Sequence, residues 1–193
     1  MEATNIKIHV KVISDYLDYY KILSTPFQSK NITKETKSFV VIRLKPEKPY
    51  VYTCFYTGHI NITGIRKVRK INSSIKALRR HLQIKDNIFT APVIDNISSK
   101  WTDKLEKFNI SKVHAIAKLE KSVQQTKYNR ERFPGLFIKT EVDGTILWFA
   151  SPAVVGVGSK TIVNLQNLKF LVESIIGEVL LSLSSTLSVY VGI

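Results

Sequence analysis

The side chains that could do covalent or metal chemistry are few and scattered along the chain. The single cysteine, Cys54, has the parity of a buried strand position and is interpreted as an inert thiol. No two histidines have the spacing of a hydrolase or of a zinc ligand set, and the acidic residues form no recognisable catalytic pair. We therefore expect no enzyme, no metal site and no cofactor, and interpret the histidines as structural or surface groups: His9, His59, His81 and His114.

The strongest chemical signal is positive charge. Of 193 residues, 29 are Lys or Arg and 15 are Asp or Glu, which gives a net charge of +14, while the 44% hydrophobic content is typical of a globular protein. This excess predicts a polyanionic partner, either nucleic acid or an acidic membrane surface. Residues 1–96 hold 17 basic and 7 acidic groups, a net +10, so the first half is expected to hold such a partner more firmly.

An internal repeat organises the chain. A shift of 94 positions places Phe39 on Phe133 and Phe55 on Phe149 without a gap, so each copy contains two phenylalanines 16 residues apart. Nearer the N-terminus the shift becomes 97, because Ile13-Ser14 matches Ile110-Ser111. The apolar positions of a later helix obey the shift of 94 as well: Val68, Ile71, Leu78 and Leu82 fall on Ile162, Leu165, Val172 and Ile176.

Each copy has the pattern strand, helix, strands, helix. Strict alternation over residues 6–12 predicts a strand, and Ser14 can cap a helix whose apolar positions continue to Leu23. Further strands are expected at 39–44, 50–55 and 60–63, followed by a basic helix at 67–82. The second copy is expected to have strands at 104–110, 133–138, 145–149 and 154–157, with helices from Ser111 and from about Thr161. The predicted organisation is a first repeat at 1–84, a connector at 85–100, a second repeat at 101–183 and an apolar extension at 184–193.

The phenylalanines have unusual neighbours for core residues. On its strand Phe39 shares a face with Arg43 and Lys45, while Val40 and Ile42 take the opposite face. An average phenylalanine is more often a core residue, and that alternative stays open from the residues alone. Parity and the repeat together favour exposed aromatic side chains on one face of the sheet.

The repeated motifs resemble the two halves of the TATA-binding protein core, over about residues 4–180. They are Phe133-Pro134-Gly135-Leu136, Phe149-Ala150-Ser151 and Val157-Gly158-Ser159-Lys160, with Phe39, Phe55-Tyr56-Thr57-Gly58 and Thr63-Gly64 in the first copy. The resemblance implies an α+β fold, a ten-stranded antiparallel saddle with four helices on its convex side. It also implies a transcription initiation factor that binds duplex DNA and bends it by wedging the phenylalanines between base steps of the minor groove.

By the same resemblance, Lys45 and Lys139 fall where the family contacts phosphates, and Asn5 and Thr63 where it contacts the groove. The family's second groove asparagine is expected to be replaced by Thr102. The resulting set of expected DNA-binding residues is Asn5, Phe39, Arg43, Lys45, Phe55, Asn61, Thr63, Phe133, Lys139, Phe149, Val155 and Val157. Lys7, Arg43 and Asn61 depart from the family's mostly apolar concave face, so DNA binding is expected without a necessary preference for TATA.

The resemblance also implies protein partners, namely general transcription factors or RNA polymerase subunits. Candidate contact residues lie on the basic helix and on the second stirrup loop: Lys70, Lys76, Arg79, Arg80, Glu141 and Asp143. A solvated helix face is the alternative for the basic group.

The apolar tract at 179–193 is too short to span a bilayer, so no membrane partner is expected. The apolar side chains of the C-terminal tail are expected to be buried, either because the tail folds back or because a partner binds it, and a homodimer is one way to do this. The short length and the Lys- and Ile-rich usage would suit a factor encoded by a large DNA virus, acting in the nucleus or at a viral replication site and not secreted. The competing interpretation is a subunit of a transcription or virion assembly that keeps this fold for binding proteins and binds DNA weakly or without specificity.

Overall fold

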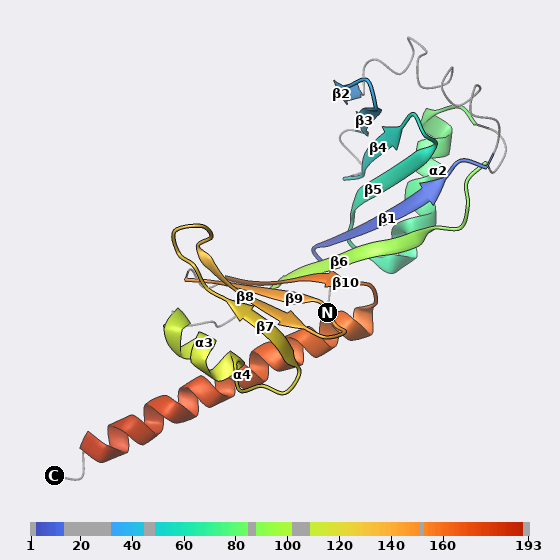
Figure 1. Ribbon diagram of the computed structural model, residues 1–193. Helices are drawn as coiled ribbons and strands as arrows, with labels where there is room; N and C mark the ends of the chain where they lie inside the picture. The colour runs from blue at the N-terminus through green and yellow to red at the C-terminus, as the bar shows by residue number, and fades with distance from the viewer. Residues whose placement is uncertain are drawn as a thin grey trace. The chain divides into compact units, whose positions relative to one another are not determined.

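The computed structural model describes residues 3–13, 32–44, 49–84, 88–101, 109–150 and 153–190. Its strands form a ten-stranded antiparallel sheet in the order β2-β3-β4-β5-β1-β6-β10-β9-β8-β7, so the predicted fold class is confirmed (Figure 1). The chain divides into two compact units, an N-terminal unit of Glu2–Asn96 and a C-terminal unit of Ile97–Ile193.

In the N-terminal unit, alternating residues build the strands. These are β1 (Asn5–Lys11), β2 (Ile32–Glu35), β3 (Phe39–Arg43), β4 (Val51–Phe55) and β5 (His59–Ile65). Apart from the edge strand β2, these strands bury every second side chain over most of their length, for example Ile6, Ile8 and Val10 along β1, because a strand turns successive side chains to opposite faces.

Helix α2 (Ile71–His81) packs against the buried face of this unit, after a short 3-10 helix η2 (Val68–Lys70). Its apolar residues recur at helical spacing, with Ile71, Ile75 and Leu78 buried. The Tyr52 hydroxyl donates to the Ser74 carbonyl at 3.0 Å, which joins β4 to the helix, and burial raises the pKa of Tyr52.

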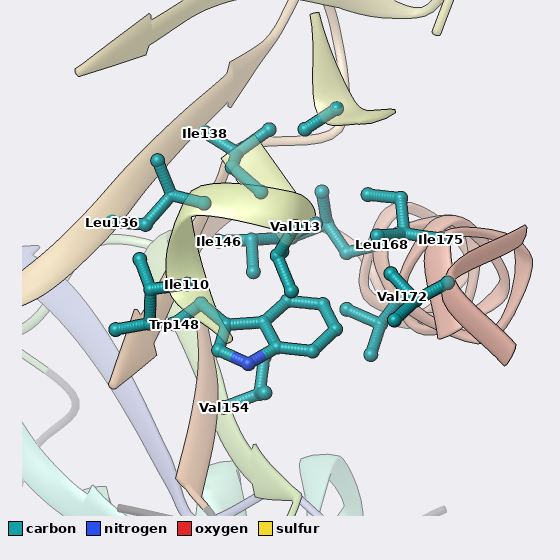
Figure 2. Packing of buried hydrophobic residues seen from close by; sticks show 12 residues of the cluster. Ile110, Val113, Leu136, Ile138, Ile146, Trp148, Val154, Leu168, Val172 and Ile175 are labelled. Carbon is teal, nitrogen blue, oxygen red and sulfur yellow. The ribbon is translucent and has the colours of Figure 1, made fainter. Parts of the chain in front are cut away.

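The C-terminal unit repeats this plan with more helix. It contains the end of β6 (Val93–Trp101), α3 (Ile110–Ala117), β7 (Val123–Lys127), β8 (Gly135–Thr140), β9 (Thr145–Phe149), β10 (Ala153–Ser159) and α4 (Ile162–Tyr190). Trp148 lies at the centre of its core, between the sheet and the apolar sides of α3 and α4 (Figure 2). The expected helices beginning near Ser111 and Thr161 are confirmed as α3 and α4, and the Asn109 side chain caps α3 by accepting from the Ser111 N–H at 2.9 Å.

The first strand of the second repeat lies earlier than predicted. This strand is β6, which runs from Val93 to Trp101 and so overlaps the expected connector 85–100. The strand predicted at 104–110 is not its position: residue 110 begins α3, and residues 102–108 lie outside the described residues. The polar stretch from Asp95 to Lys100 looks like a linker because Asp and Asn have low strand propensity. Pairing with β10 overrides that propensity, and Ile97 and Ser99 are buried.

Three further differences concern the ends and edges of the elements. The described residues contain three α-helices, whereas four were expected; the helix predicted from Ser14 lies outside those residues. The edge strands β2 and β7 have no apolar alternation to reveal them. Helix α4 is 29 residues long and continues through position 184, where a separate extension was expected to begin. Within the described part of the chain, no helix is both long and apolar enough to cross a membrane.

Candidate nucleic-acid interface

Each unit has one sheet face that packs on helices and one that does not. We call the second the open face. In the N-terminal unit, the open face carries the odd-numbered residues of β1, β3 and β4 and those of β5 as far as Thr63, because Val40, Ile42, Tyr52 and Cys54 point into the core. In the C-terminal unit it carries Phe137 and Lys139 of β8, and the odd-numbered residues of β9 and of β10 as far as Val157.

Both predicted phenylalanine pairs come together on the open face. Phe39 and Phe55 are direct cross-strand partners, and their ring centroids lie 5.6 Å apart. Phe133 and Phe149 have the same centroid separation, 5.6 Å, and nearly the same tilt, 61° against 57°. None of the four rings is a fully buried core residue, and Phe133 is 39% exposed.

The two pairs reach this geometry in different ways. Phe39 lies on β3, whereas Phe133 precedes β8, and Gly135 is the direct partner of Phe149. A Cβ atom on Gly135 would lie 2.8 Å from Cε1 of Phe133 and 3.1 Å from Cε1 of Phe149. The missing side chain at this position therefore makes the room in which the two rings meet.

Cations flank the aromatic pairs. Arg43 and Lys139 are exposed on β3 and β8, while Lys45 lies outside the described residues. The structure adds Lys34, which the sequence reasoning missed: its ammonium lies 5.7 Å from the centroid of the Phe39 ring, in a cation–π contact. Lys127 on β7 is the cross-strand partner of Phe137. Both new residues belong to edge strands, so no alternation in the sequence placed them near the phenylalanines.

The remaining predicted groove residues lie on β1, β5 and β10. The side-chain oxygen Oδ1 of Asn5 accepts from the Gly64 N–H at 2.7 Å, and Asn61 is the cross-strand partner of His9. Thr63 pairs with Val51. In the other unit, Val155 and Val157 pair with Leu147 and Thr145.

The strand pairing corrects the position of the second asparagine. Ile6 pairs with Ile65, and Ile97 pairs with Ser159, which is the equivalent of Ile65 in the second repeat. Ile97 is thus equivalent to Ile6, and Asn96 to Asn5. The first strands are related by a shift of 91 residues and not 97, so the expected Thr102, itself outside the described residues, is not the match. Asn96 lies inside β6, and the signal that marks it in the sequence is that Asn96-Ile97 repeats Asn5-Ile6.

A charged cluster on the open face of the N-terminal unit was also missed. Asp95 Oδ1 lies 2.6 Å from His9 Nδ1, and Asp95 Oδ2 lies 3.4 Å from Lys7 Nζ. His9 and Lys7 alternate with the buried Ile8 on β1, so the carboxylate between them is on the open face. The misplaced connector hid this contact, because Asp95 was not expected to lie on a strand beside β1.

The expected partner-binding residues lie in two separate groups. Lys70, Lys76 and Arg80 are exposed on η2 and α2, and Arg79 is half-buried there. Glu141 is exposed in the turn between β8 and β9, but the Asp143 carboxylate faces inward. It accepts from the side-chain amides of Asn164 at 2.7 Å and Asn167 at 3.1 Å, so Asp143 fastens the turn to the start of α4.

These features define a class of fold. Ten antiparallel strands in this order, formed by two repeats that each end in a helix on the buried face, are the TATA-binding-protein-like fold predicted from the sequence. Among solved structures, the chain is similar to Methanococcus jannaschii TBP, with 22% sequence identity and a TM-score of 0.67; the match covers 91% of this chain and 97% of that chain. A scan against protein-family models and a search of the curated proteins both gave no match.

Proposed function

We propose that this protein is a non-enzymatic, TATA-binding-protein-like transcription initiation factor that binds duplex DNA in the minor groove and bends it by phenylalanine insertion. The observation that carries the proposal is the pair of aromatic rings in each unit, at the same centroid separation of 5.6 Å and on a face not used for packing.

In such a complex, lost base stacking is compensated by new contacts between the DNA and the protein. Wedging an apolar ring between base pairs costs a few kcal/mol per step, because stacking is partly lost. The kinked duplex then lies against more of the open face, and cations such as Arg43 and Lys139 attract its phosphates. The contact of the Lys34 ammonium with the Phe39 ring adds charge beside the wedge itself.

The test measures binding and bending together. Duplexes selected from a random pool are labelled at both ends for energy transfer, and the wild-type chain is compared with Phe133→Ala/Phe149→Ala at two salt concentrations. We expect the double variant to lose the bend and at least about tenfold in affinity, because without the rings the duplex does not kink and the contacts that the bend permits with the open face are lost. Phe170→Ala is the matched control, since Phe170 is 67% exposed on α4, away from the open face.

A second candidate function has its own observation. On the helix side of the C-terminal unit, Phe170 is 67% exposed and Leu119 is 82% exposed. These side chains favour a protein partner, as in a subunit of a transcription or virion assembly. DNA binding that is weak, steeply salt-dependent and indifferent to the Phe133→Ala/Phe149→Ala change would favour this function over the first.

A further inference from the structure

The open faces of the two units differ in chemistry along equivalent rows of the sheet. In the N-terminal unit the row is Val41, Thr53, Asn61 and His9. In the C-terminal unit the equivalent row is Phe137, Leu147, Val155 and Lys100. The row of the N-terminal unit is therefore polar over most of its length, and the Asp95 carboxylate is hydrogen-bonded to its His9 end.

A carboxylate is an unusual group to turn toward DNA, so the neutralisation of Asp95 matters. Lys7 and His9 lie on either side of it, with distances of 3.4 Å from Lys7 Nζ to Oδ2 and 2.6 Å from His9 Nδ1 to Oδ1. The side chain is 27% exposed, so the oxygens are not closed off from a ligand. A carboxylate has about four lone-pair sites, and these two partners leave some of them free to accept.

The minor groove offers one hydrogen-bond donor that such a group can use. A·T and T·A pairs present only the acceptors N3 of adenine and O2 of thymine, whereas a G·C pair adds the 2-amino group of guanine. Facing A·T pairs, the carboxylate would meet acceptors and lose its water without compensation. Facing guanine, it would accept a hydrogen bond.

We propose that Asp95 is a specificity-determining residue that accepts a hydrogen bond from the guanine 2-amino group in the minor groove. The inference rests on the proposed function, because it requires the open face to contact the groove. Asn61 on β5 is the cross-strand partner of His9 and adds a second polar side chain next to this cluster. The apolar row of the C-terminal unit has no carboxylate among its paired residues, so the preference for guanine belongs to the N-terminal unit.

The experiment removes the amino group without touching the major groove. The full chain is first given a random duplex pool; in the highest-affinity duplex, each guanine is then replaced in turn by inosine, which lacks the 2-amino group. We expect at least one replacement to weaken wild-type binding about tenfold, the usual size of one base contact. In Asp95→Asn the acceptor is a neutral amide oxygen, which is weaker than a carboxylate, and the amide NH2 can donate to the ring nitrogen N3 that inosine keeps, so the same replacement should have a much smaller effect.

Glu173→Gln is the matched control. It removes one negative charge, as Asp95→Asn does, but it breaks an ion pair with Lys169, 3.3 Å long, on α4. This variant should keep the wild-type response to inosine. Because all three proteins are compared on the same duplexes, the weaker pairing of inosine affects each of them equally. If Asp95→Asn does not fold, as judged by circular dichroism, Asp95→Glu replaces it: moving the carboxylate by one methylene should reduce the response.

Three outcomes have distinct meanings. Loss of the inosine effect in the Asp95 variant alone supports the assignment. A wild-type chain that binds and bends DNA but ignores every inosine, or an Asp95→Asn chain that responds as the wild type does, overturns it and leaves the proposed function standing. A wild-type chain that selects and bends no duplex overturns both.

Discussion

Two glycines, Gly135 and Gly64, are needed near the aromatic rings for different structural reasons. Gly135 leaves room for Phe133 and Phe149, because a Cβ there would lie within 3.1 Å of both rings. Gly64 has φ +84°, and a Cβ there would lie 2.1 Å from the carbonyl oxygen of Pro49. Its N–H donates to Asn5, so a candidate groove residue is held in place by a backbone shape that only glycine adopts easily.

Gly64→Ala should therefore be strongly destabilising. The left-handed backbone strains any other residue, and backbone atoms of Pro49 cannot move aside as a flexible side chain would. We expect a loss of at least about 2 kcal/mol in the free energy of unfolding, measured by urea denaturation.

Gly177→Ala is the matched control for that substitution. Gly177 lies in α4 and a Cβ there meets nothing within 4 Å. Alanine favours a helix over glycine by about 0.5–1 kcal/mol, so this variant should be slightly more stable than the wild type. Equal, small effects of the two substitutions would contradict the close approach of Pro49 to Gly64.

At the scale of elements, the end of α2 should make folding sensitive to pH. His81 is its last residue, and Nε2 of His81 has no hydrogen-bond partner among the residues the structure describes. Burial lowers the pKa of His81, and burial followed by the charge of Lys118 lowers that of His114. A helix C-terminus attracts a protonated histidine and so acts in the opposite direction to burial at His81.

The sign of the effect follows from proton linkage. The unfolded chain titrates near the ordinary histidine value, about 6.5, and binds the proton more readily than the folded chain. Stability is therefore full above this pH and falls as pH drops below it. The urea midpoint should be lower at about pH 5.5 than at about pH 7.5, and His81→Gln should reduce that difference. His59→Gln, on the exposed start of β5, is the control that should leave it unchanged.

The elements also show why sequence reasoning succeeded in some places and failed in others. Strand β1 could be predicted because its apolar residues alternate strictly, and β3 and β4 because they are short runs rich in β-branched and aromatic residues. Helix α2 could be predicted because its apolar residues recur at helical spacing. Strand β6 could not, since its Asp, Asn and Ser residues have low strand propensity and form a strand only between β1 and β10. The phenylalanine pairs could be predicted from the repeat. The contact of Asp95 with His9 could not, because it depends on β6 lying beside β1 in the sheet.

For the whole molecule, the net charge of +14 should make DNA binding steeply dependent on salt. Each phosphate that the protein neutralises contributes about −0.9 to the slope of log K against log salt. Arg43→Gln, which removes an exposed cation of the open face, should make that slope shallower by about 1. The measurement is a titration of one duplex over a range of salt concentrations.

The control for this experiment lies on the other side of the N-terminal unit. Arg80→Gln changes the charge by the same amount on α2, which packs on the buried face. Its slope should match that of the wild type. Identical slopes for wild type, Arg43→Gln and Arg80→Gln would mean that the open face is not the surface that contacts phosphates.

The difference between the open-face rows of the two repeats affects the orientation in which the protein would bind a duplex. A protein made of two identical halves would bind a duplex equally well in either of two orientations related by a half-turn. Here one half presents Thr53 and Asn61 where the other presents Leu147 and Val155. In the proposed complex, a difference of about 1.4 kcal/mol in binding free energy between the two orientations favours one of them tenfold. Divergence after duplication would thus give the bound protein a polarity, from which an initiation complex could distinguish upstream from downstream.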